Sequence, residues 1–381
     1  MSDTQKHTKP NVPNLRFPGF EGEWEKYTLG EIGVPYIGLT YSPADIVNEG
    51  GTIVFRSSNI QNGEIDYSDI VQVNKKIKDS IITRKDDLLI CARNGSPRLI
   101  GKNALLKESD AGQTFGAFML VFRSMDNHFV HQLLSTKGYY SQVSENLGAR
   151  INQITTSNIK DFEFYFPPST AERNKIAQFL DLIDERISIQ NKVIEKYESL
   201  IKAITRCLVH CNGHQCFLGD IAEIYQPKTI TGLEMSNGGQ YPVFGANGII
   251  GHYKDYNHAS PQICIACRGN TCGVLNYSLP FSWITGNSMV INVDSSASGV
   301  NKRFLFHLLS TVDYSPLISG SGQPQIVRGP LRKLRITLPD KQCQDKNAQI
   351  IDCLIEKSNV EKALLRKLQT QKNYFLTAVF I

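Results

Sequence analysis

The chain has 381 residues, which is long for one domain and suits two. Hydrophobic residues make up 41% of it and charged residues 20%, as in a globular protein with packed cores and unlike a disordered chain. No run of about 18 apolar residues occurs, and the first residues lack the apolar segment of a signal peptide, so the sequence predicts a cytoplasmic protein without a membrane span. The net charge of +5 permits nucleic-acid binding without requiring it.

Short strands and turns are predicted for the first globular region, because short apolar runs alternate there with Gly and Asn. A helix is predicted over 128–147, and a strand over 161–166 leads into the next helix. The other strands of this region are predicted over 52–56, 65–73, 87–93 and 117–122.

A long amphipathic helix is predicted over 169–209, with Pro167 and Pro168 before it and Ser169 or Thr170 as its N-cap. Apolar side chains recur along it at alternating steps of four and three, the a/d spacing of a coiled coil. At ~1.5 Å per residue the helix is roughly 60 Å long, and so narrow an apolar stripe needs a partner helix. The seam consists of Ile176, Leu180, Ile183, Ile187, Gln190, Ile194, Tyr197, Ile201, Ile204 and Leu208.

The second half of the chain repeats the first in the same order. One match would be chance, but an ordered series of matches indicates a duplication. It aligns Arg93 with Arg268 and Gln153 with Gln325. The matched segments are TLGEIG (28–33) with FLGDIA (217–222), LLICARNG (88–95) with ICIACRGN (263–270), RINQIT (150–155) with GQPQIV (322–327), and FEFYFP (162–167) with LRITLP (334–339).

A second long helix is predicted over 341–381, with a less regular seam that Lys357, Glu361 and Gln371 interrupt. This helix starts at the second globular region, so it can pair with the first helix only by running antiparallel to it. The predicted seam positions are Ile350, Leu354, Val360, Leu364, Leu368 and Phe375.

The predicted fold class is α+β: two similar mixed α/β domains separated by two long antiparallel coiled-coil helices, with pseudo-twofold symmetry. Two similar heads held apart suit a partner with two spaced, similar sites, such as duplex DNA, which presents the same groove face every ~34–36 Å. The predicted boundaries are 1–168 for the first domain, 169–210 for the first helix, 211–340 for the second domain and 341–381 for the second helix.

The nine cysteines make a zinc site worth weighing. One group, Cys207, Cys211, His214 and Cys216, lacks the paired C-x-x-C spacing of a zinc ribbon. Cys264 and Cys267 stand in an apolar run, where cysteine behaves as a small hydrophobic residue. We therefore favour reduced cysteines over zinc ligands, and no metal site is predicted.

Catalytic motifs are missing from the sequence. No Asp or Glu has a Lys two residues later, so the acid-x-Lys pattern of common Mg²⁺-dependent nucleases is absent. The Pro-Pro pair lacks the preceding Asn or Asp and the following aromatic residue of a DNA aminomethyltransferase. Neither a G-x-x-x-x-G-K-[ST] loop for ATP nor a G-x-S-x-G nucleophile motif occurs. The sequence therefore predicts a protein that is not itself an enzyme and that binds no cofactor.

Polar residues able to read base edges follow the matched strands. Arg can form two hydrogen bonds with guanine, and Asn or Gln with adenine, whereas Lys contacts phosphates. Each residue taken singly is more simply a solvated loop residue, and Tyr241 is more simply a core residue. Their recurrence at matched places favours DNA contacts. The candidates are Arg93, Asn94, Ser96, Arg98, Lys102, Asn103, Arg150, Asn152, Gln153, Tyr241, Asn247, Arg268, Asn270, Thr271, Gln323 and Gln325.

The chain resembles the DNA-specificity subunit of type I restriction–modification systems. The resemblance spans nearly the whole chain, but the family offers no transferable base-reading motif. The segments that carry it are PNLRFPGFEGEWEKYTLGEI (13–32), FEFYFPPSTAERNKIAQFLDLIDERI (162–187), YPVFGANGIIGHY (241–253) and SGQPQIVRGPLRKLRITLP (321–339).

The resemblance implies two target-recognition domains, each reading one half of a bipartite double-stranded DNA site. It implies that the helices set the spacing and dock two methyltransferase (modification) subunits, while the strands Asp161–Pro167 and Leu334–Pro339 close the domains. S-adenosylmethionine, ATP and Mg²⁺ are expected on the partner methyltransferase and restriction/translocase subunits. The expected docking residues are Ile176, Leu180, Ile183, Ile187, Ile194, Ile201, Leu354, Leu364 and Leu368.

Two other functions compete with this one. A helical protein-interaction scaffold without DNA reading would use the helices for assembly and show no steep salt dependence of DNA binding. A self-contained restriction enzyme is disfavoured by the missing catalytic motifs.

Overall fold

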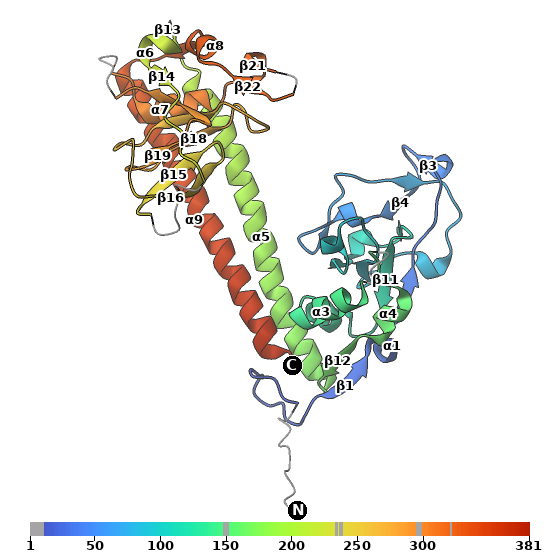
Figure 1. The fold of residues 1–381 in the computed structure, drawn as a ribbon. Helices are drawn as coiled ribbons and strands as arrows, with labels where there is room; N and C mark the ends of the chain where they lie inside the picture. The colour runs from blue at the N-terminus through green and yellow to red at the C-terminus, as the bar shows by residue number, and fades with distance from the viewer. Residues whose placement is uncertain (1–10, 148–151, 233–234, 236–238, 295–298, 321) are drawn as a thin grey trace, which may run out of the picture. The chain divides into compact units, whose positions relative to one another are not determined.

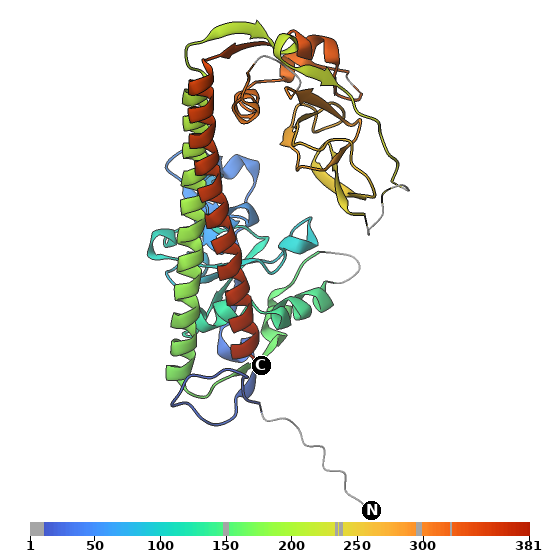
Figure 2. The ribbon, with the colours of Figure 1, turned by 90° about the vertical axis from the view of Figure 1, so that its left-hand side faces the viewer.

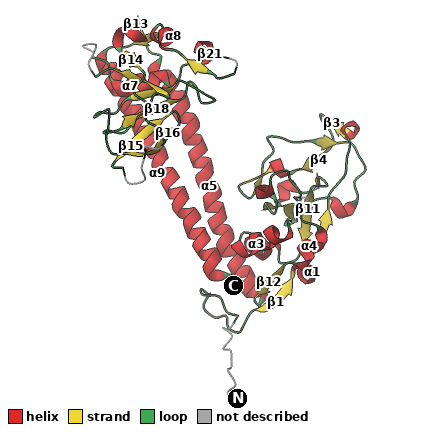
Figure 3. Ribbon diagram, in the orientation of Figure 1, coloured by secondary structure: helices red, strands yellow, loops and turns green. Residues whose placement is uncertain are grey.

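The computed structural model describes residues 11–147, 152–232, 235, 239–294, 299–320 and 322–381. The chain divides into two compact units: unit 1 comprises Met1–Lys192 and Ala363–Ile381, and unit 2 comprises Val193–Lys362. Figure 3 shows that each unit combines short strands with helices, as in an α+β protein. Each unit contains part of both long helices.

Unit 1 is built on an antiparallel sheet with the strand order β2-β11-β8-β9 (Figure 1). A second sheet, β10-β4-β7-β3, contains the parallel pair β4 and β10. The first and last strands of the unit, β1 and β12, pair with each other just before the first long helix. The strands are β1 (Glu25–Thr28), β2 (Val34–Ile37), β3 (Ile46–Val47), β4 (Thr52–Phe55), β5 (Ile60–Gln61), β6 (Glu64–Ile65), β7 (Gln72–Val73), β8 (Leu88–Cys91), β9 (Asn103–Leu105), β10 (Thr114–Phe115), β11 (Met119–Arg123) and β12 (Glu163–Phe166).

Unit 2 repeats this plan. The sheet β14-β20-β17-β18 matches β2-β11-β8-β9, the parallel pair β15 and β19 matches β4 and β10, and β13 pairs with β23 as β1 pairs with β12. The strands are β13 (His214–Phe217), β14 (Glu223–Tyr225), β15 (Tyr241–Gly245), β16 (Gly248–Tyr253), β17 (Ile263–Ala266), β18 (Leu275–Tyr277), β19 (Trp283–Ile284), β20 (Ser288–Asn292), β21 (Ile318–Ser319), β22 (Gln325–Ile326) and β23 (Arg335–Leu338).

Short helices follow the same repeat, and the matched segments 28–33 and 217–222 show why. The carboxylate of Glu31 accepts a hydrogen bond from the backbone N–H of Thr28, and Asp220 does the same for Phe217, so an acid caps each short helix. The helices are α1 (Leu29–Ile32), α2 (Asn127–Leu133), α3 (Lys137–Asn146), α4 (Thr156–Asp161), α5 (Thr170–Val209), α6 (Leu218–Ile221), α7 (Lys302–Leu309), α8 (Arg328–Arg332) and α9 (Lys341–Val379).

The central strand of each main sheet is buried on both faces. In β8 the side chains of Leu88 and Ile90 join one core and those of Leu89 and Cys91 join another. In β17 Cys264 is likewise a fully buried core residue. These strands therefore read as continuous apolar runs, as buried strands do.

Helices α5 and α9 run antiparallel and side by side within each unit (Figures 1 and 2). In unit 1 the Phe179 and Phe375 rings lie 4.9 Å apart between centroids, and Lys372 pairs with Asp184 at 2.5 Å. In unit 2 the amide of Asn347 donates to the backbone oxygen of Leu208 at 2.8 Å. Every predicted seam residue of α5 is buried or half-buried, which confirms that seam.

The predicted seam of α9 is partly wrong. Ile350, Val360 and Leu364 are 38%, 63% and 37% exposed, whereas the buried positions include Ile351 and Ser358. Two of the three predicted interruptions are also misplaced, because Lys357 and Gln371 are exposed, whereas Glu361 is half-buried. The reason is that polar residues occupy part of the true seam. Buried Gln344 donates to the oxygen of Pro339 and accepts from the nitrogen of Asn301, so it needs no apolar replacement.

Two local predictions also differ from the structure. The helix predicted over 128–147 is interrupted between α2 and α3, where the Thr136 hydroxyl caps α3 by accepting from the nitrogen of Tyr139. The strand predicted over 65–73 is two strands, because the Asp66 carboxylate accepts from the nitrogen of Ser68 and turns the chain.

The structure also bears on metals and membranes. Among the described residues, no group of three or more His, Cys, Asp or Glu side chains is arranged to hold a metal ion. Cys211 and Cys343 lie with their sulfur atoms 3.7 Å apart and are free thiols. None of the helices in the described part of the chain is long and apolar enough to span a membrane.

Candidate nucleic-acid interface

The backbones of an Arg and a Gln pair as an isolated β-bridge at the same place in both units. Arg93, which follows β8, forms an antiparallel bridge with Gln153, and Arg268, which follows β17, forms one with Gln325. The flanking hydrogen bonds also match: Ile154 donates to the oxygen of Ala92 at 2.8 Å, as Ile326 does to that of Cys267 at 3.1 Å. The alignment predicted from the sequence is confirmed, and each main sheet has a loop pair at this end.

The cations of these loops are available to an external anion. Arg93, Arg98, Lys102 and Arg268 form no ion pair with any described residue. Other arginines are committed to the fold; Arg123, for example, pairs with Asp87 at 2.8 Å. Unpaired cations beside the exposed ends of strands suit contacts with phosphates or with base edges.

The remaining candidates fall into groups by exposure. Asn94 is tied into the loop, because its amide donates to the hydroxyl of Ser57 at 2.9 Å. Tyr241 packs edge-on against Tyr256 at 5.0 Å between centroids, and Arg150 lies outside the described residues. The exposed candidates are Arg93, Ser96, Arg98, Asn247, Arg268, Asn270, Gln323 and Gln325, and the half-buried ones are Asn94, Lys102, Asn152, Gln153, Tyr241 and Thr271.

Asn103 is a correction, because its side chain is buried and fully used inside unit 1. Its amide nitrogen donates to the oxygens of Gly101 and Leu134, and its oxygen lies 3.0 Å from Nδ1 of His131. A side chain with both ends engaged cannot read a base without breaking these bonds. The polar residue type suggested a contact, whereas the strand β9 turns it inward.

His131 provides a pH test of this buried network. Burial lowers the pKa of His131 to about 4, opposed by the negative charge of Asp184 and assisted by the positive charge of Lys372. Because the unfolded chain binds this proton at a higher pH than the folded chain, the free energy of unfolding falls as the pH drops from about 6.5 toward 4. At pH 5 we expect a loss of about 1–2 kcal/mol relative to pH 7.5 that a His131→Gln variant lacks.

Urea denaturation of both proteins at the two pH values measures this difference. The opposing histidine, His128, has its pKa raised by its hydrogen bond to Asp181, and its contribution cancels in the comparison because both proteins retain it. Equal pH dependence of the two proteins would contradict the prediction.

Each unit is fastened to a long helix by the same face of its short helix. In unit 1, His128 of α2 contacts Asp181 of α5 at 2.7 Å, and Gln132 donates to Asp181 and Asp184. In unit 2 the residues at the matching positions of α7, Arg303 and His307, contact one carboxylate of α9, as described next. Polar contacts therefore hold the short helix of each unit to a long helix.

The carboxylate of Asp352 joins Arg303 and His307 in unit 2. It lies 2.7 Å from Nε2 of His307, and both Nε and Nη2 of Arg303 donate to it. Partial burial alone would raise the pKa of Asp352, but the hydrogen bonds from Arg303 and His307 lower it. Burial also lowers the pKa of His307 despite the nearby Asp352. The contact between the short helix and a long helix is thus formed by different side chains in the two units.

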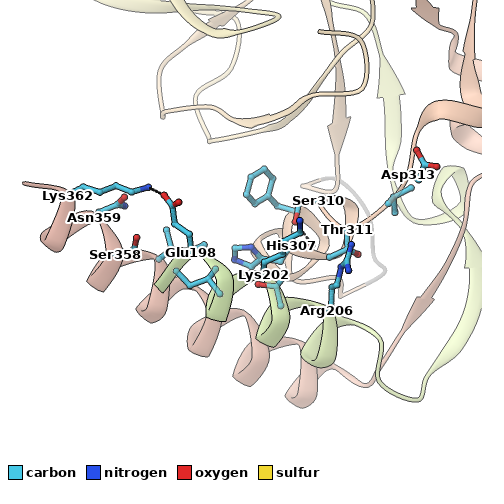
Figure 4. Close-up of a pocket in the computed structure, with 15 residues that line it drawn as sticks. Glu198, Lys202, Arg206, His307, Ser310, Thr311, Asp313, Ser358, Asn359 and Lys362 are labelled. Atoms are coloured by element: carbon cyan, nitrogen blue, oxygen red, sulfur yellow. Dashed lines mark hydrogen bonds and ion pairs between the residues drawn. The ribbon is translucent and has the colours of Figure 1, made fainter. Parts of the chain in front are cut away.

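Matched hollows lie where each short helix ends. In unit 2 a hollow of about 550 Å³ is bounded by α5, α7 and α9, and Figure 4 shows Lys202 and Arg206 of α5 near His307, Ser310 and Thr311. In unit 1 a hollow of about 410 Å³ adjoins the corresponding residues Ser135 and Thr136 and the end of α9. Neither Lys202 nor Arg206 forms an ion pair with a described residue, whereas Lys362 pairs with Glu198 at 2.6 Å.

Residues that the sequence analysis missed are Phe118 and Arg56. Phe118 falls in the predicted strand 117–122 and precedes the observed strand β11; it is 57% exposed, and its ring lies 4.9 Å from the guanidinium carbon of Arg93. Arg56 lines a hollow of about 500 Å³ beside Phe118. The sequence offered no signal that sets these two residues apart.

The fold and the site define a class: a duplicated protein whose recognition chemistry lies on paired loops of two similar domains joined to two long helices. The chain belongs to the type I restriction modification DNA specificity domain family, whose profile matches residues 21–199 and 215–370. The predicted fold class of two similar α/β domains with two long antiparallel helices is confirmed.

Several curated relatives are similar over part of their length. The chain is 30% identical to the type I restriction enzyme EcoprrI specificity subunit of Escherichia coli over 112 residues, which cover 29% of this chain and 27% of the relative. It is 27% identical to the EcoKI specificity subunit of E. coli strain K12 over 45% of this chain and 38% of the relative. For the StySPI specificity subunit of Salmonella potsdam the values are 26%, 49% and 42%. The matches thus span less than half of each relative.

Two solved structures share the fold over nearly the whole chain. The type I restriction–modification S subunit from M. genitalium has a TM-score of 0.67 at 19% identity, covering 97% of this chain and 99% of that one. A chain from a study of complex assembly and conformational transition of the type I restriction–modification system has a TM-score of 0.54 at 16% identity, covering 95% and 98%.

Proposed function

We propose that this protein is the sequence-specific DNA-recognition subunit of a type I restriction–modification complex, in which each unit reads one half of a bipartite target. The observation that carries the proposal is the duplicated Arg–Gln bridge, with unpaired, exposed Arg93 and Arg268 at matched strand ends. Family membership supports DNA as the ligand. The scaffold alternative is not favoured, because it gives no reason for two matched sets of unpaired polar loops.

The proposal includes a division of labour along the chain. Residues 1–168 and 211–340 form the two reading domains, and 169–210 and 341–381 form the helices that set their spacing. The chain is non-catalytic and works in the cytoplasm with an adenine methyltransferase and an ATP-dependent endonuclease. S-adenosylmethionine, ATP and Mg²⁺ belong to those partners, in line with the missing catalytic motifs of this chain.

Sequencing of modified bases in the source genome tests the function directly. With the gene present, we expect adenine methylation at one asymmetric two-part motif, and with the gene deleted that motif is unmethylated. Gel-shift experiments with the methyltransferase present should find specific binding to the same motif, with affinity that falls steeply with salt. Methylation that persists unchanged after deletion would overturn the proposal.

The matched hollows are the proposed docking places for two copies of the methyltransferase subunit. Each hollow offers one copy of the partner a seat beside a short helix, although α5, α7 and α9 line the one in unit 2 and β12 and the end of α9 help line the one in unit 1; exposed apolar side chains lie along the same long helices. Of the predicted docking residues, Leu180 is fully buried in the structure, so the proposal also includes exposed side chains such as Leu182 and Leu200, which are 65% and 49% exposed.

Charge reversal in one hollow should remove one seat. In the double variant Lys202→Glu and Arg206→Glu, we expect the methyltransferase to chain ratio in the purified complex to fall from about two to about one, because the unit 1 hollow is untouched. The control reverses the same charge at Lys346 and Lys357, two exposed α9 residues outside the hollow. Native mass spectrometry measures the ratio, and an unchanged ratio in the first variant would place docking elsewhere.

A further inference from the structure

One exposed position beside each matched arginine carries a different side chain in the two units. In unit 1 the backbone nitrogens of Ala92 and Arg93 donate to the oxygen of Phe118 at 2.9 and 3.0 Å. In unit 2 the backbone nitrogen of Cys267 donates to the oxygen of Asn287 at 3.1 Å. These bonds place Phe118 and Asn287 at equivalent points of the two units.

The strand registers give the same equivalence independently. Met119 of β11 faces Cys91 of β8, and Ser288 of β20 faces Ala266 of β17. Phe118 and Asn287 are therefore the residues immediately before the matched strands, each across from the strand end that precedes an unpaired arginine. The matched segments found in the sequence do not include Phe118 and Asn287, because the residues around these two positions differ in composition.

The two side chains face solvent and contribute little to a core. Phe118 is 57% exposed, although its neighbours Gly116 and Met119 are buried, so its ring adds little to a core. Asn287 is exposed, and its amide makes no hydrogen bond with a described residue. An exposed aromatic ring and an exposed amide at equivalent positions can recognise different groups on a ligand, and neither adds much to the stability of its unit.

We propose, on the basis of the proposed function, that Phe118 and Asn287 are paired specificity positions that read different bases in the two half-sites. Phe118 makes the apolar contact with the C5-methyl group of a pyrimidine in the major groove, and Asn287 forms two hydrogen bonds with N6 and N7 of an adenine. Each acts beside its arginine, Arg93 or Arg268. This exchanged side chain contributes to the asymmetry of the target that the duplicated scaffold reads.

The hollow next to Phe118 adds a hydrogen-bond donor to the unit 1 site. Its volume is about 500 Å³, and Tyr41, Arg56 and Ser57 line it with Phe118. Nη2 of Arg56 pairs with the Asp69 carboxylate at 2.8 Å, so this guanidinium is held in place at the wall of the hollow. A cation held beside the Phe118 ring favours a negatively charged or acceptor group of the DNA at this point.

Modified bases in the DNA test the two contacts atom by atom. The chain is used in its complex with the methyltransferase, on duplexes that carry the motif found for the wild-type protein. Replacing one thymine by deoxyuridine in the half-site read by unit 1 should weaken wild-type binding about four-fold, the value for one buried methyl group. The same replacement should have no effect on binding by Phe118→Ala. Probes with cytosine and 5-methylcytosine at that position separate thymine from another methylated pyrimidine as the source of the contact.

Asn287 is tested in the same way in the other half-site. Replacing one adenine by 7-deazaadenine removes the N7 acceptor and should weaken wild-type binding about ten-fold. Binding by Asn287→Ala should be insensitive to it. Met125→Ala, which truncates a fully exposed apolar residue of unit 1, is the control for Phe118→Ala and should keep the full deoxyuridine penalty.

The outcomes separate this inference from the function on which it rests. Loss of each base penalty only in its own variant supports the assignment. A wild-type complex that binds one bipartite motif, together with variants that keep every penalty, overturns the specificity positions and leaves the function intact. A wild-type complex with no preference for any motif overturns the proposed function itself. Both substitutions are at exposed positions, so circular dichroism and thermal unfolding should match the wild type.

Discussion

Replacing Arg268 with alanine is expected to relax base discrimination in one half of a two-part DNA target and to leave the other half read as before. Arg268 is exposed, has no ion-pair partner among the described residues, and is held at a strand end by its bridge to Gln325. Loss of a bidentate contact to guanine costs about 1–3 kcal/mol. Arg93→Ala should have the same effect in the other half-site.

The double variant Arg93→Ala and Arg268→Ala should lose about 2–6 kcal/mol of specific binding, because effects in two separate units add. Competition binding against a library of half-site variants, with the methyltransferase present, measures each half separately. Arg268→Lys keeps the charge but not the planar fork, so it should also lose discrimination while retaining the salt dependence. Lys346→Ala removes an exposed cation of α9 that is not part of the loops and should change neither quantity.

A different pattern would reassign these arginines. A uniform loss of affinity over all sequences, with a salt slope reduced by about 1 per arginine, marks a phosphate contact and not a base contact. The two outcomes are distinguishable in one titration series at several salt concentrations. Either result would support contact between the matched loops and the DNA. An unchanged affinity in the double variant would show that these arginines do not contact the DNA.

Most of the architecture could be predicted because the chain repeats itself. The match of Arg93 with Arg268 and of Gln153 with Gln325 came from sequence alone, and the structure joins these pairs in identical bridges. The seam of α5 was also predictable, because it is apolar nearly throughout and its period is fixed by helix geometry. Repetition and periodicity can be recognised in the sequence itself, so predicting them requires no knowledge of tertiary contacts.

The failures share a different cause, which is that tertiary contacts decide them. Helix α9 buries Gln344 and Asn347 because acceptors and donors on other segments satisfy them, and no periodic apolar pattern records such partners. Asn103 looked like a loop contact and is instead the centre of a buried network. Phe118 was predicted only as part of the strand 117–122, and its ring is exposed just before β11. In each case, whether the side chain is buried or exposed depends on tertiary contacts that the residue type does not reveal.

Truncating Leu180 to alanine is expected to destabilise unit 1 by about 2–5 kcal/mol, the cost of a cavity in a core that cannot collapse. Leu180 is fully buried in α5 and belongs to the same cluster as Trp24, Phe129 and Phe380. Leu182→Ala is the matched control, because that side chain is 65% exposed on the same turn of the helix, and its effect should stay within about 0.5 kcal/mol.

The two tryptophans of the chain allow this loss to be assigned to one unit. Trp24 lies in the core of unit 1 and Trp283 in unit 2, so a Trp283→Phe background leaves Trp24 as the reporter of unit 1. In that background Leu180→Ala should lower the urea midpoint followed by Trp24 fluorescence. In a Trp24→Phe background, Trp283 should report whether unit 2 unfolds with unit 1 or separately. A midpoint shift of equal size for Leu180→Ala and Leu182→Ala would show that α5 presents no buried seam to α9, and the helices could not then fix the spacing of two reading domains.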